Sequence, residues 1–194
     1  MLDAFDNKKR CNWVKRGDPL LIAYHDKEWG RASYDAKKLF EMLILEGAQA
    51  GLNWRTVLQK REGYKAAFHH FDIEKMAAMT EADIDRLAKN PAIIRNRLKI
   101  KSAINNARVW KKLAQVQNMV DYLWSFVDYK PIRRHHCDDY YQLPSTTKES
   151  DTMSRALKEQ GFSFVGGTIC YAFMQAVGMV DDHTSNCFLF KSPV

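Results

Sequence analysis

The stretch that decides the fold is residues 39–54, Leu-Phe-Glu-Met-Leu-Ile-Leu-Glu-Gly-Ala-Gln-Ala-Gly-Leu-Asn-Trp. At about 100° per residue, the apolar side chains of this stretch, such as Leu39 and Leu43, gather on one face of a helix. Glu46 falls on the same face, three residues after Leu43 and seven after Leu39. Glu41 is predicted to lie on the opposite, charged face. Glu46 is therefore a carboxylate that points toward the core.

A carboxylate on the apolar face of a helix needs a partner or a purpose. Burial of an unpaired carboxylate is costly, or it raises the pKa until the group is neutral. Because acids with perturbed pKa values gather at functional sites, Glu46 is a candidate site residue. The alternative is a structural role, in which Glu46 caps a neighbouring helix or pairs with a buried arginine. The helical pattern alone leaves both readings open.

The composition fits a basic protein with one core. Of the 194 residues, 46% are apolar and 12% aromatic, which is enough for the chain to fold alone. The formal net charge of +7 favours an anionic partner, nucleic acid before a membrane surface, with a basic enzyme that has no such partner as the alternative. No apolar run reaches the roughly 18 residues of a membrane span, and the start of the chain lacks the apolar segment of a signal peptide. We therefore expect a cytoplasmic protein without membrane contact, whose cysteines are reduced thiols.

The order of patterns along the chain predicts an all-α fold. Residues 1–10 are expected to form a flexible tail, and residues 11–194 a single unit with two helical lobes. After irregular chain with at most one short helix near residues 20–26, helices are predicted to follow the caps Asp35, Asn53, Asp72 and Thr80, to begin near Arg97, and to cover residues 119–127, 153–157 and 168–177. Residues 128–150 are predicted to be a loop or linker. No strand pattern or internal repeat is evident.

Four side chains that can bind a metal lie near the two ends of the chain: Cys11, His25, His183 and Cys187. Zinc takes thiolate and imidazole ligands in tetrahedral geometry, and a structural site uses four protein ligands. One such set would tie the ends together and contribute to folding. The alternative is a satisfied core histidine and buried thiols, because the Cys11-x13-His25 spacing matches no compact zinc finger. Cys137 and Cys170 are expected to be buried thiols only.

Four aromatic residues flank Glu46 in the sequence: Trp13, Tyr24, Trp29 and Trp54. Aromatic faces attract cations by about 0.5–2 kcal/mol each and stack on nucleobases by about 1–3 kcal/mol. A pocket of such rings with one inward carboxylate suits a flat, positively charged ring that bears an N–H donor. Ordinary core packing is the alternative, since that is what most Trp and Tyr side chains do.

The segment 90–101, Asn-Pro-Ala-Ile-Ile-Arg-Asn-Arg-Leu-Lys-Ile-Lys, combines a turn with the start of a helix. Its cations are Arg95, Arg97, Lys99 and Lys101. A helix N-terminus with free N–H groups and nearby cations can bind a phosphate without reading the base. The alternative for such a charge run is a solvated helix face.

A series of motifs runs in order from about residue 11 to residue 190: Cys11-Asn12-Trp13, Asp18-Pro19-Leu20, Tyr24-His25-Asp26, Glu28-Trp29-Gly30, Leu45-Glu46-Gly47, Gln49-Ala50-Gly51-Leu52-Asn53-Trp54, Ile93-Ile94-Arg95-Asn96-Arg97, Phe164-Val165-Gly166 and the segment from His183 to Cys187. Together they resemble the bacterial DNA-3-methyladenine glycosylase I family. The resemblance implies a helix-hairpin-helix DNA glycosylase fold, in which one structural zinc ion, held by the four metal-binding side chains named above, ties the terminal segments together.

The resemblance also implies a base pocket between the two helical lobes. In that pocket Tyr24 and Trp54 would stack on the excised methylated adenine, and Glu46 would accept hydrogen bonds from it. Trp13 and Trp29 would complete the walls. Leu21 stands where some relatives have a tyrosine, which removes a possible ring from the pocket.

The family's DNA contacts map onto two further segments. The basic turn over residues 93–101 would be the hairpin that grips the phosphate backbone beside the lesion. Gln49 and Leu52 fall where a side chain could fill the gap left in the duplex. The family lacks the catalytic aspartate that most of its superfamily has after the hairpin, and residues 103–108 likewise contain no Asp. The mechanism must therefore work without that base.

The implied activity is hydrolysis of the N-glycosidic bond of 3-methyladenine in double-stranded alkylated DNA, which releases the base and leaves an abasic site. The sequence leaves the oligomeric state open, with a monomer as the default. Glu46 would act by hydrogen bonding and electrostatics rather than as a nucleophile. No lysine is evidently poised to form a Schiff base, which predicts a monofunctional enzyme. Two alternatives remain. A zinc-stabilised DNA-binding module without catalysis would leave Glu46 unexplained, and a hydrolase of free nucleosides would give the basic turn no role.

Overall fold

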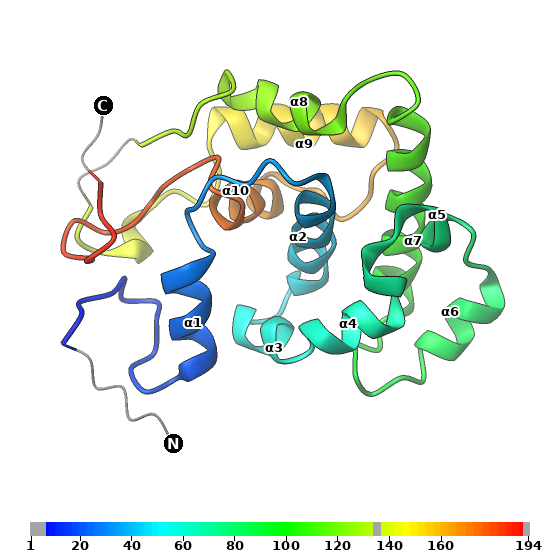
Figure 1. The fold of residues 1–194 in the computed structure, drawn as a ribbon, viewed down its shortest axis with the longest axis horizontal. Helices are drawn as coiled ribbons and strands as arrows, with labels where there is room; N and C mark the ends of the chain where they lie inside the picture. The colour runs from blue at the N-terminus through cyan, green and yellow to red at the C-terminus, as the bar shows by residue number, and fades with distance from the viewer. Residues whose placement is uncertain (1–6, 134–136, 192–194) are drawn as a thin grey trace.

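The computed structural model describes residues 7–133 and 137–191, which form helices joined by loops (Figure 1). The elements are, in order, α1 (Pro19–Lys27), α2 (Ala36–Gln49), α3 (Trp54–Gln59), α4 (Arg61–Ala67), η1 (His69–Phe71), α5 (Ile73–Ala77), α6 (Glu81–Leu87), α7 (Arg97–Leu113), α8 (Met119–Trp124), η2 (Ser125–Val127), η3 (Tyr140–Gln142), α9 (Lys148–Glu159) and α10 (Gly167–Ala176). An isolated bridge between Ile132 and Val180 is the only strand-like pairing in the described segments. The all-α prediction is thus confirmed for them.

Helix α2 is the central element of the fold. Every residue from Leu39 to Ala48 is buried, because α10 lies beside this helix and α3, α7 and α8 also pack against it (Figure 1). The side chain of Asp35 caps the helix by accepting a hydrogen bond from the backbone N–H of Lys38 at 2.7 Å, as its position predicts. The helix therefore holds Glu46 inside the molecule.

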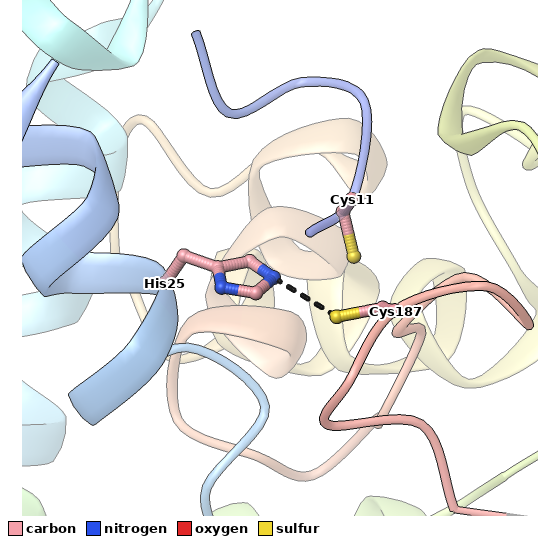
Figure 2. Close-up of side chains that lie close together, drawn as sticks. All are labelled: Cys11, His25 and Cys187. Atoms are coloured by element: carbon pink, nitrogen blue, oxygen red, sulfur yellow. Dashed lines mark hydrogen bonds between the residues drawn. The ribbon is translucent and has the colours of Figure 1, made fainter. Parts of the chain in front are cut away.

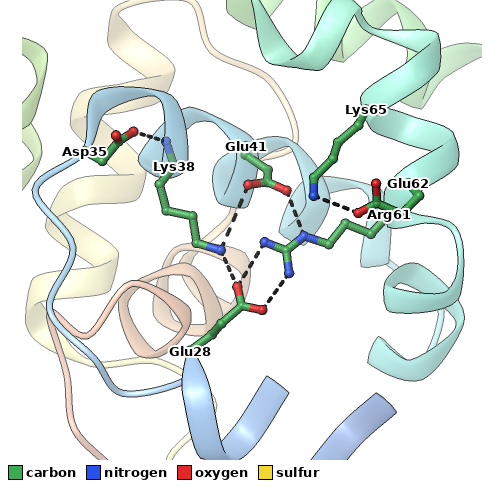
Figure 3. Close-up of polar contacts among 7 residues, drawn as sticks. All are labelled: Glu28, Asp35, Lys38, Glu41, Arg61, Glu62 and Lys65. Carbon is green, nitrogen blue, oxygen red and sulfur yellow. Dashed lines mark hydrogen bonds and ion pairs between the residues drawn. The ribbon is translucent and has the colours of Figure 1, made fainter. Parts of the chain in front are cut away.

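The prediction that Glu41 lies on a solvent-facing side of α2 is wrong. Glu41 is 8% exposed, and the Nε–H of Arg61 on α4 donates to its carboxylate at 2.7 Å. Arg61 also donates to both carboxylate oxygens of Glu28, at 2.8 and 2.9 Å, and Lys38 is a further partner of Glu28 (Figure 3). Burial raises the pKa of Glu28, but the hydrogen bonds from Arg61 and Lys38 outweigh it and lower that pKa to about 2. The helical period could not reveal that Arg61 of α4 and Glu28, which follows α1, meet the charged groups of this face.

Two further groups of helices pack around α2. Helices α5 and α6 pack against α7, whereas α9 packs against α10 and lies beside α8 (Figure 1). The apolar stripe predicted for α7, from Ile100 to Trp110, is buried. The caps predicted at Asn53, Asp72 and Thr80 are present. The predicted loop over residues 128–150 contains η3 and ends where α9 begins.

The two terminal segments of the described chain meet at one side of the fold, far from α5 to α7 (Figure 1). The backbone N–H of Phe188 donates to the carbonyl of Lys9 at 2.8 Å, and Arg10 pairs with Asp26 at 2.6 Å. These contacts include two residues of the segment predicted to be a flexible tail. Within the described ranges, no helix has the length and apolarity needed to span a membrane.

Candidate functional site

A cavity of about 420 Å³ lies between α1, α2, α3, η3 and α10. Its walls are formed by Trp13, Leu21, Tyr24, Trp29, Glu46, Gln49, Asn53, Trp54, Arg55, Tyr140, Tyr141, Ala172 and Gln175. The five residues that were predicted to form a pocket all line this cavity, although they come from separate segments of the chain. The cavity is large enough for a purine base, and six of its thirteen lining residues are aromatic.

Glu46 is the one acidic side chain among the lining residues. It is 4% exposed, and within the described part of the chain its carboxyl group makes no hydrogen bond or ion pair. Burial raises the pKa of Glu46 to about 8. Burial also raises the pKa of Tyr24 well above its ordinary value, and the nearby charge of Glu46 adds to that shift. Among the described residues, Glu46 therefore neither pairs with an arginine nor caps a helix, as the structural alternative requires.

The aromatic side chains form one continuous group around Glu46. The ring centroids of Tyr24 and Trp54 are 5.2 Å apart, and those of Trp13 and Trp29 are also 5.2 Å apart. The Trp13 and Trp54 indole N–H groups are buried without a partner among the described residues. A buried N–H group without a partner destabilises the protein, so a ligand that accepts hydrogen bonds is favoured here. The aromatic walls favour a flat ligand.

A buried cluster of Cys11, His25 and Cys187 lies where the two ends of the chain meet, with its side chains pointing toward one another (Figure 2). Their ligand atoms are all within 4.8 Å of one another, and His25 Nε2 is 3.5 Å from Cys187 Sγ. The hydrogen bond between the two thiol groups lowers the pKa of Cys187 and raises that of Cys11. These three residues could hold a metal ion.

His183, the fourth predicted ligand, lies against this cluster. Its ring centroid is 5.1 Å from that of His25, and its Nε2 atom is buried without a partner among the described residues. The Nδ1 atoms of both rings face carboxylates, at 2.6 Å from Asp181 and 2.8 Å from Asp26. Carboxylates on Nδ1 orient the opposite nitrogen toward a metal. Gly30, with φ of +69°, leaves room for the ring, since a Cβ there would lie 2.6 Å from His183 Cε1.

Comparison with known proteins decides the family. The sequence profile of the methyladenine glycosylase family matches residues 13–190. This chain belongs to the methyladenine glycosylase family. It is 52% identical over 180 residues to DNA-3-methyladenine glycosylase 1 of Escherichia coli (strain K12), which covers 92% of this chain and 95% of that protein.

Solved structures agree with that assignment. A crystal structure of 3-methyladenine DNA glycosylase I has a TM-score of 0.91 and 51% identity, covering 94% of this chain and 100% of the other. A variant of 3-methyladenine DNA glycosylase I in complex with 3-methyladenine has a TM-score of 0.89 and 34% identity, covering 95% of this chain and 99% of the other. The resemblance inferred from the motifs is therefore confirmed.

The basic residues predicted to contact DNA in this methyladenine glycosylase lie around the start of α7. Arg97 pairs with Glu81 at 2.8 Å and also with Asp85, and Lys101 pairs with Glu81 at 2.9 Å. Arg95 is exposed on the turn before the helix. Exposed ion pairs of this kind contribute about 0–1 kcal/mol, so a phosphate could replace the carboxylates at little cost.

Lys99 has a different position from the other three. Its ammonium group donates to the carbonyls of Ala48 and Ala50, at 2.8 and 2.6 Å, and so caps the C-terminal end of α2. The end of α2 and the turn that follows it carry the two predicted gap-filling residues. Gln49 lines the cavity, and the side chain of Leu52 is 42% exposed beside it. Lys99 therefore braces this turn in the structure.

The sequence analysis missed several cavity residues, among them Tyr140 and Gln175. Tyr140 lies in the segment predicted to be a loop or linker, where no period places a side chain. Gln175, in contrast, is a polar residue in the otherwise apolar run 168–177, the same signal that singled out Glu46. Its amide oxygen faces Tyr140, whose O–H donates to Gln175 Oε1 at 3.1 Å. Attention to polar exceptions in apolar helices would have found it.

Proposed function

We propose that this chain is a DNA glycosylase that hydrolyses the N-glycosidic bond of 3-methyladenine in alkylated double-stranded DNA. The observation that carries the proposal is Glu46, a buried carboxyl group without a partner among the described residues, in a cavity walled by Trp13, Tyr24, Trp29 and Trp54. Relatives over nearly the full length are named DNA-3-methyladenine glycosylases, and one related structure contains 3-methyladenine. The products would be the free base and an abasic site.

The reaction requires the target nucleotide to leave the base stack, which costs a few kcal/mol. In the cavity, Tyr24 and Trp54 would stack on the base, and Glu46 would accept its N–H groups. Adenine methylated at N3 is cationic, so the bonding electrons move easily onto the base when the bond to C1′ breaks. The backbone phosphates would stabilise the sugar cation. A water molecule then bonds to C1′ and releases a proton.

The same features would exclude undamaged adenine. A neutral base lacks the positive charge that favours the ionised form of Glu46 and that aromatic faces attract. Its glycosidic bond is also less reactive. Discrimination would thus act on binding and on bond breaking together, although neither requires a nucleophilic side chain.

The helix-hairpin-helix part of the proposal concerns the turn between α6 and α7. The exposed Arg95 and the weakly paired Arg97 and Lys101 would grip backbone phosphates beside the lesion. Lys99 would contribute through the turn that it braces. Gln49, at the end of α2, or Leu52, in the turn that follows, would occupy the gap left in the duplex by the extruded base.

We further propose that the cluster at the chain ends holds one structural zinc ion, with Cys11, His25, His183 and Cys187 as ligands. Two sulfur and two imidazole donors suit tetrahedral zinc, and the unpartnered Nε2 of His183 fits this role. Trp29 links the cluster to the cavity, because its ring centroid is 4.8 Å from that of His183. The ion would supply no chemistry to the reaction and would stabilise one wall of the base pocket.

The decisive experiment measures base release from methylated duplex DNA and from a methylated nucleoside. A glycosylase releases 3-methyladenine from the duplex and is inactive or much slower on the nucleoside. Binding to the duplex without release would favour a DNA-binding module, and faster release from the nucleoside would favour a nucleoside hydrolase. Glu46→Gln keeps the shape of the side chain but removes its charge, and it should release the base more slowly than the wild type. An unchanged rate would contradict the role of Glu46.

A further inference from the structure

Tyr140, on η3, is a cavity residue that no motif identified. It lines the cavity together with Glu46, and its ring centroid lies 5.9 Å from that of Trp29 and 6.2 Å from that of Trp13. The side chain is half-buried, and burial together with the charge of Glu46 raises the pKa of Tyr140. Its hydroxyl group therefore stays protonated at neutral pH and is available for hydrogen bonding.

The direction of the hydrogen bond between Tyr140 and Gln175 is determined by the contact of Gln175 with Asp182. The buried carboxylate of Asp182 accepts a hydrogen bond from the Tyr171 hydroxyl at 2.5 Å and another from Gln175 Nε2 at 2.8 Å. The amide nitrogen of Gln175 therefore faces Asp182. The amide oxygen of Gln175 then faces Tyr140 and accepts its O–H at 3.1 Å.

This chain of hydrogen bonds determines what Tyr140 can offer a ligand. A phenol has one O–H donor and can also accept. Because its proton is held by Gln175, the oxygen of Tyr140 has only lone pairs left for the cavity. The cavity thus offers the Tyr140 oxygen as an acceptor in addition to the Glu46 carboxylate.

We propose that Tyr140 contacts the bound base, with its hydroxyl oxygen accepting an N–H of the 6-amino group of 3-methyladenine, and that Gln175 is a positioning residue that sets the direction of this bond. The inference rests on the proposed function. An exocyclic amine has two N–H donors, and a donor buried without an acceptor weakens binding. A second acceptor beside Glu46 would therefore favour 6-aminopurines over purines that lack the amine.

The test compares affinities for two free bases by calorimetry: 3-methyladenine and 3-methylpurine, which lacks the 6-amino group. Tyr140→Phe retains the ring and removes the oxygen, so it should weaken 3-methyladenine binding about 3- to 10-fold, the range for one neutral hydrogen bond. Its affinity for 3-methylpurine should stay within about 2-fold of the wild type. Tyr129→Phe, at an exposed tyrosine outside the cavity, is the matched control and should bind both bases as the wild type does.

The role of Gln175 is tested by a double-mutant cycle. Gln175→Met should weaken 3-methyladenine binding about 2- to 5-fold, and the double variant with Tyr140→Phe should bind no more weakly than Tyr140→Phe alone, because both changes remove the same interaction. Additive losses would refute the positioning role. An equal loss for both bases, or unchanged binding by Tyr140→Phe, would refute the contact. If the wild type bound no 3-methyladenine, both the proposed function and the role of Tyr140 would be refuted. If the wild type bound the base and the Tyr140→Phe results differed from those expected, only the role of Tyr140 would be refuted.

Discussion

The raised pKa of Glu46 predicts a specific pH dependence of base excision. Burial raises this pKa to about 8 in the free protein, and it raises the pKa values of the lining residues Tyr24 and Tyr140 above the ordinary tyrosine value. If the pKa is about 8, about 1% of the Glu46 side chains are ionised at pH 6, about 10% at pH 7 and about 50% at pH 8. In the proposed mechanism, the cationic nucleotide requires the ionised form of Glu46.

The quantity to measure is kcat/KM for 3-methyladenine release, because its pH profile reports the groups of the free enzyme. It should rise about 10-fold per pH unit between pH 6 and 7 and about 50-fold in total by pH 8, and then level off. The value of kcat should level off at lower pH, since the bound cation lowers the pKa of Glu46. A suitable assay is release of the labelled base from methylated duplex DNA at sub-saturating concentration, corrected for spontaneous loss.

Glu46→Gln provides the control, because it cannot ionise. Its kcat/KM should be low and nearly flat over the same range. A flat wild-type profile, or a rise retained in Glu46→Gln, would refute the assignment of the titration to this side chain.

The raised pKa of Glu46 also affects stability: the free energy of unfolding should fall as pH rises, whereas activity should increase. In the unfolded chain Glu46 loses its proton near pH 4.5, and in the folded protein only near pH 8. Between these values the folded state binds more protons, so the free energy of unfolding falls as pH rises, by at most about 1.4 kcal/mol per pH unit from this group. Denaturant unfolding at pH 5 and pH 8 should therefore show Glu46→Gln gaining stability relative to the wild type at the higher pH. If Glu46→Gln instead gained stability relative to the wild type at pH 5, the raised pKa of Glu46 would be contradicted.

Three further predictions concern the surroundings of the cavity. Cys187→Ser should lose the metal and lower the unfolding temperature, and elemental analysis that finds metal-free, fully stable wild type would exclude the zinc site. Lys99→Met should lower the free energy of unfolding by about 1–3 kcal/mol in chemical denaturation, because it leaves two carbonyls without their donor. The DNA affinity of Lys99→Met should keep the wild-type salt dependence, whereas Arg95→Ala should reduce the slope of that dependence by about one. The reverse pattern would show that Lys99 contacts a phosphate and Arg95 does not. Arg61→Met should destabilise the protein by about 2–4 kcal/mol, since it leaves Glu28 and Glu41 without their main partner, and a loss below about 1 kcal/mol would show that solvent satisfies both.

Local signals in the sequence determined most of the fold. Caps such as Asp35 and Asn53 act through their own neighbouring N–H groups, so their effect can be read from adjacent residues. The buried stripe of α7 follows from its period in the same way. The segment around Tyr140 has neither signal, because its position depends on contacts with α10 and the N-terminal segment that no local pattern encodes. The cavity itself is likewise a product of packing between segments distant in sequence.

The contrast between Glu41 and Glu46 explains why periodicity was informative for one acid and misleading for the other. Both lie on α2 and both are buried, because neighbouring segments cover nearly the whole surface of this helix. Arg61 meets Glu41 with a charged hydrogen bond at 2.7 Å, so that acid is satisfied and joins α2 to α4. Nothing in the described protein meets Glu46, and its carboxyl group faces a cavity instead. Burial is therefore a poor guide to function on a central helix, whereas an unsatisfied carboxyl group has an electrostatic cost that a cationic ligand can remove.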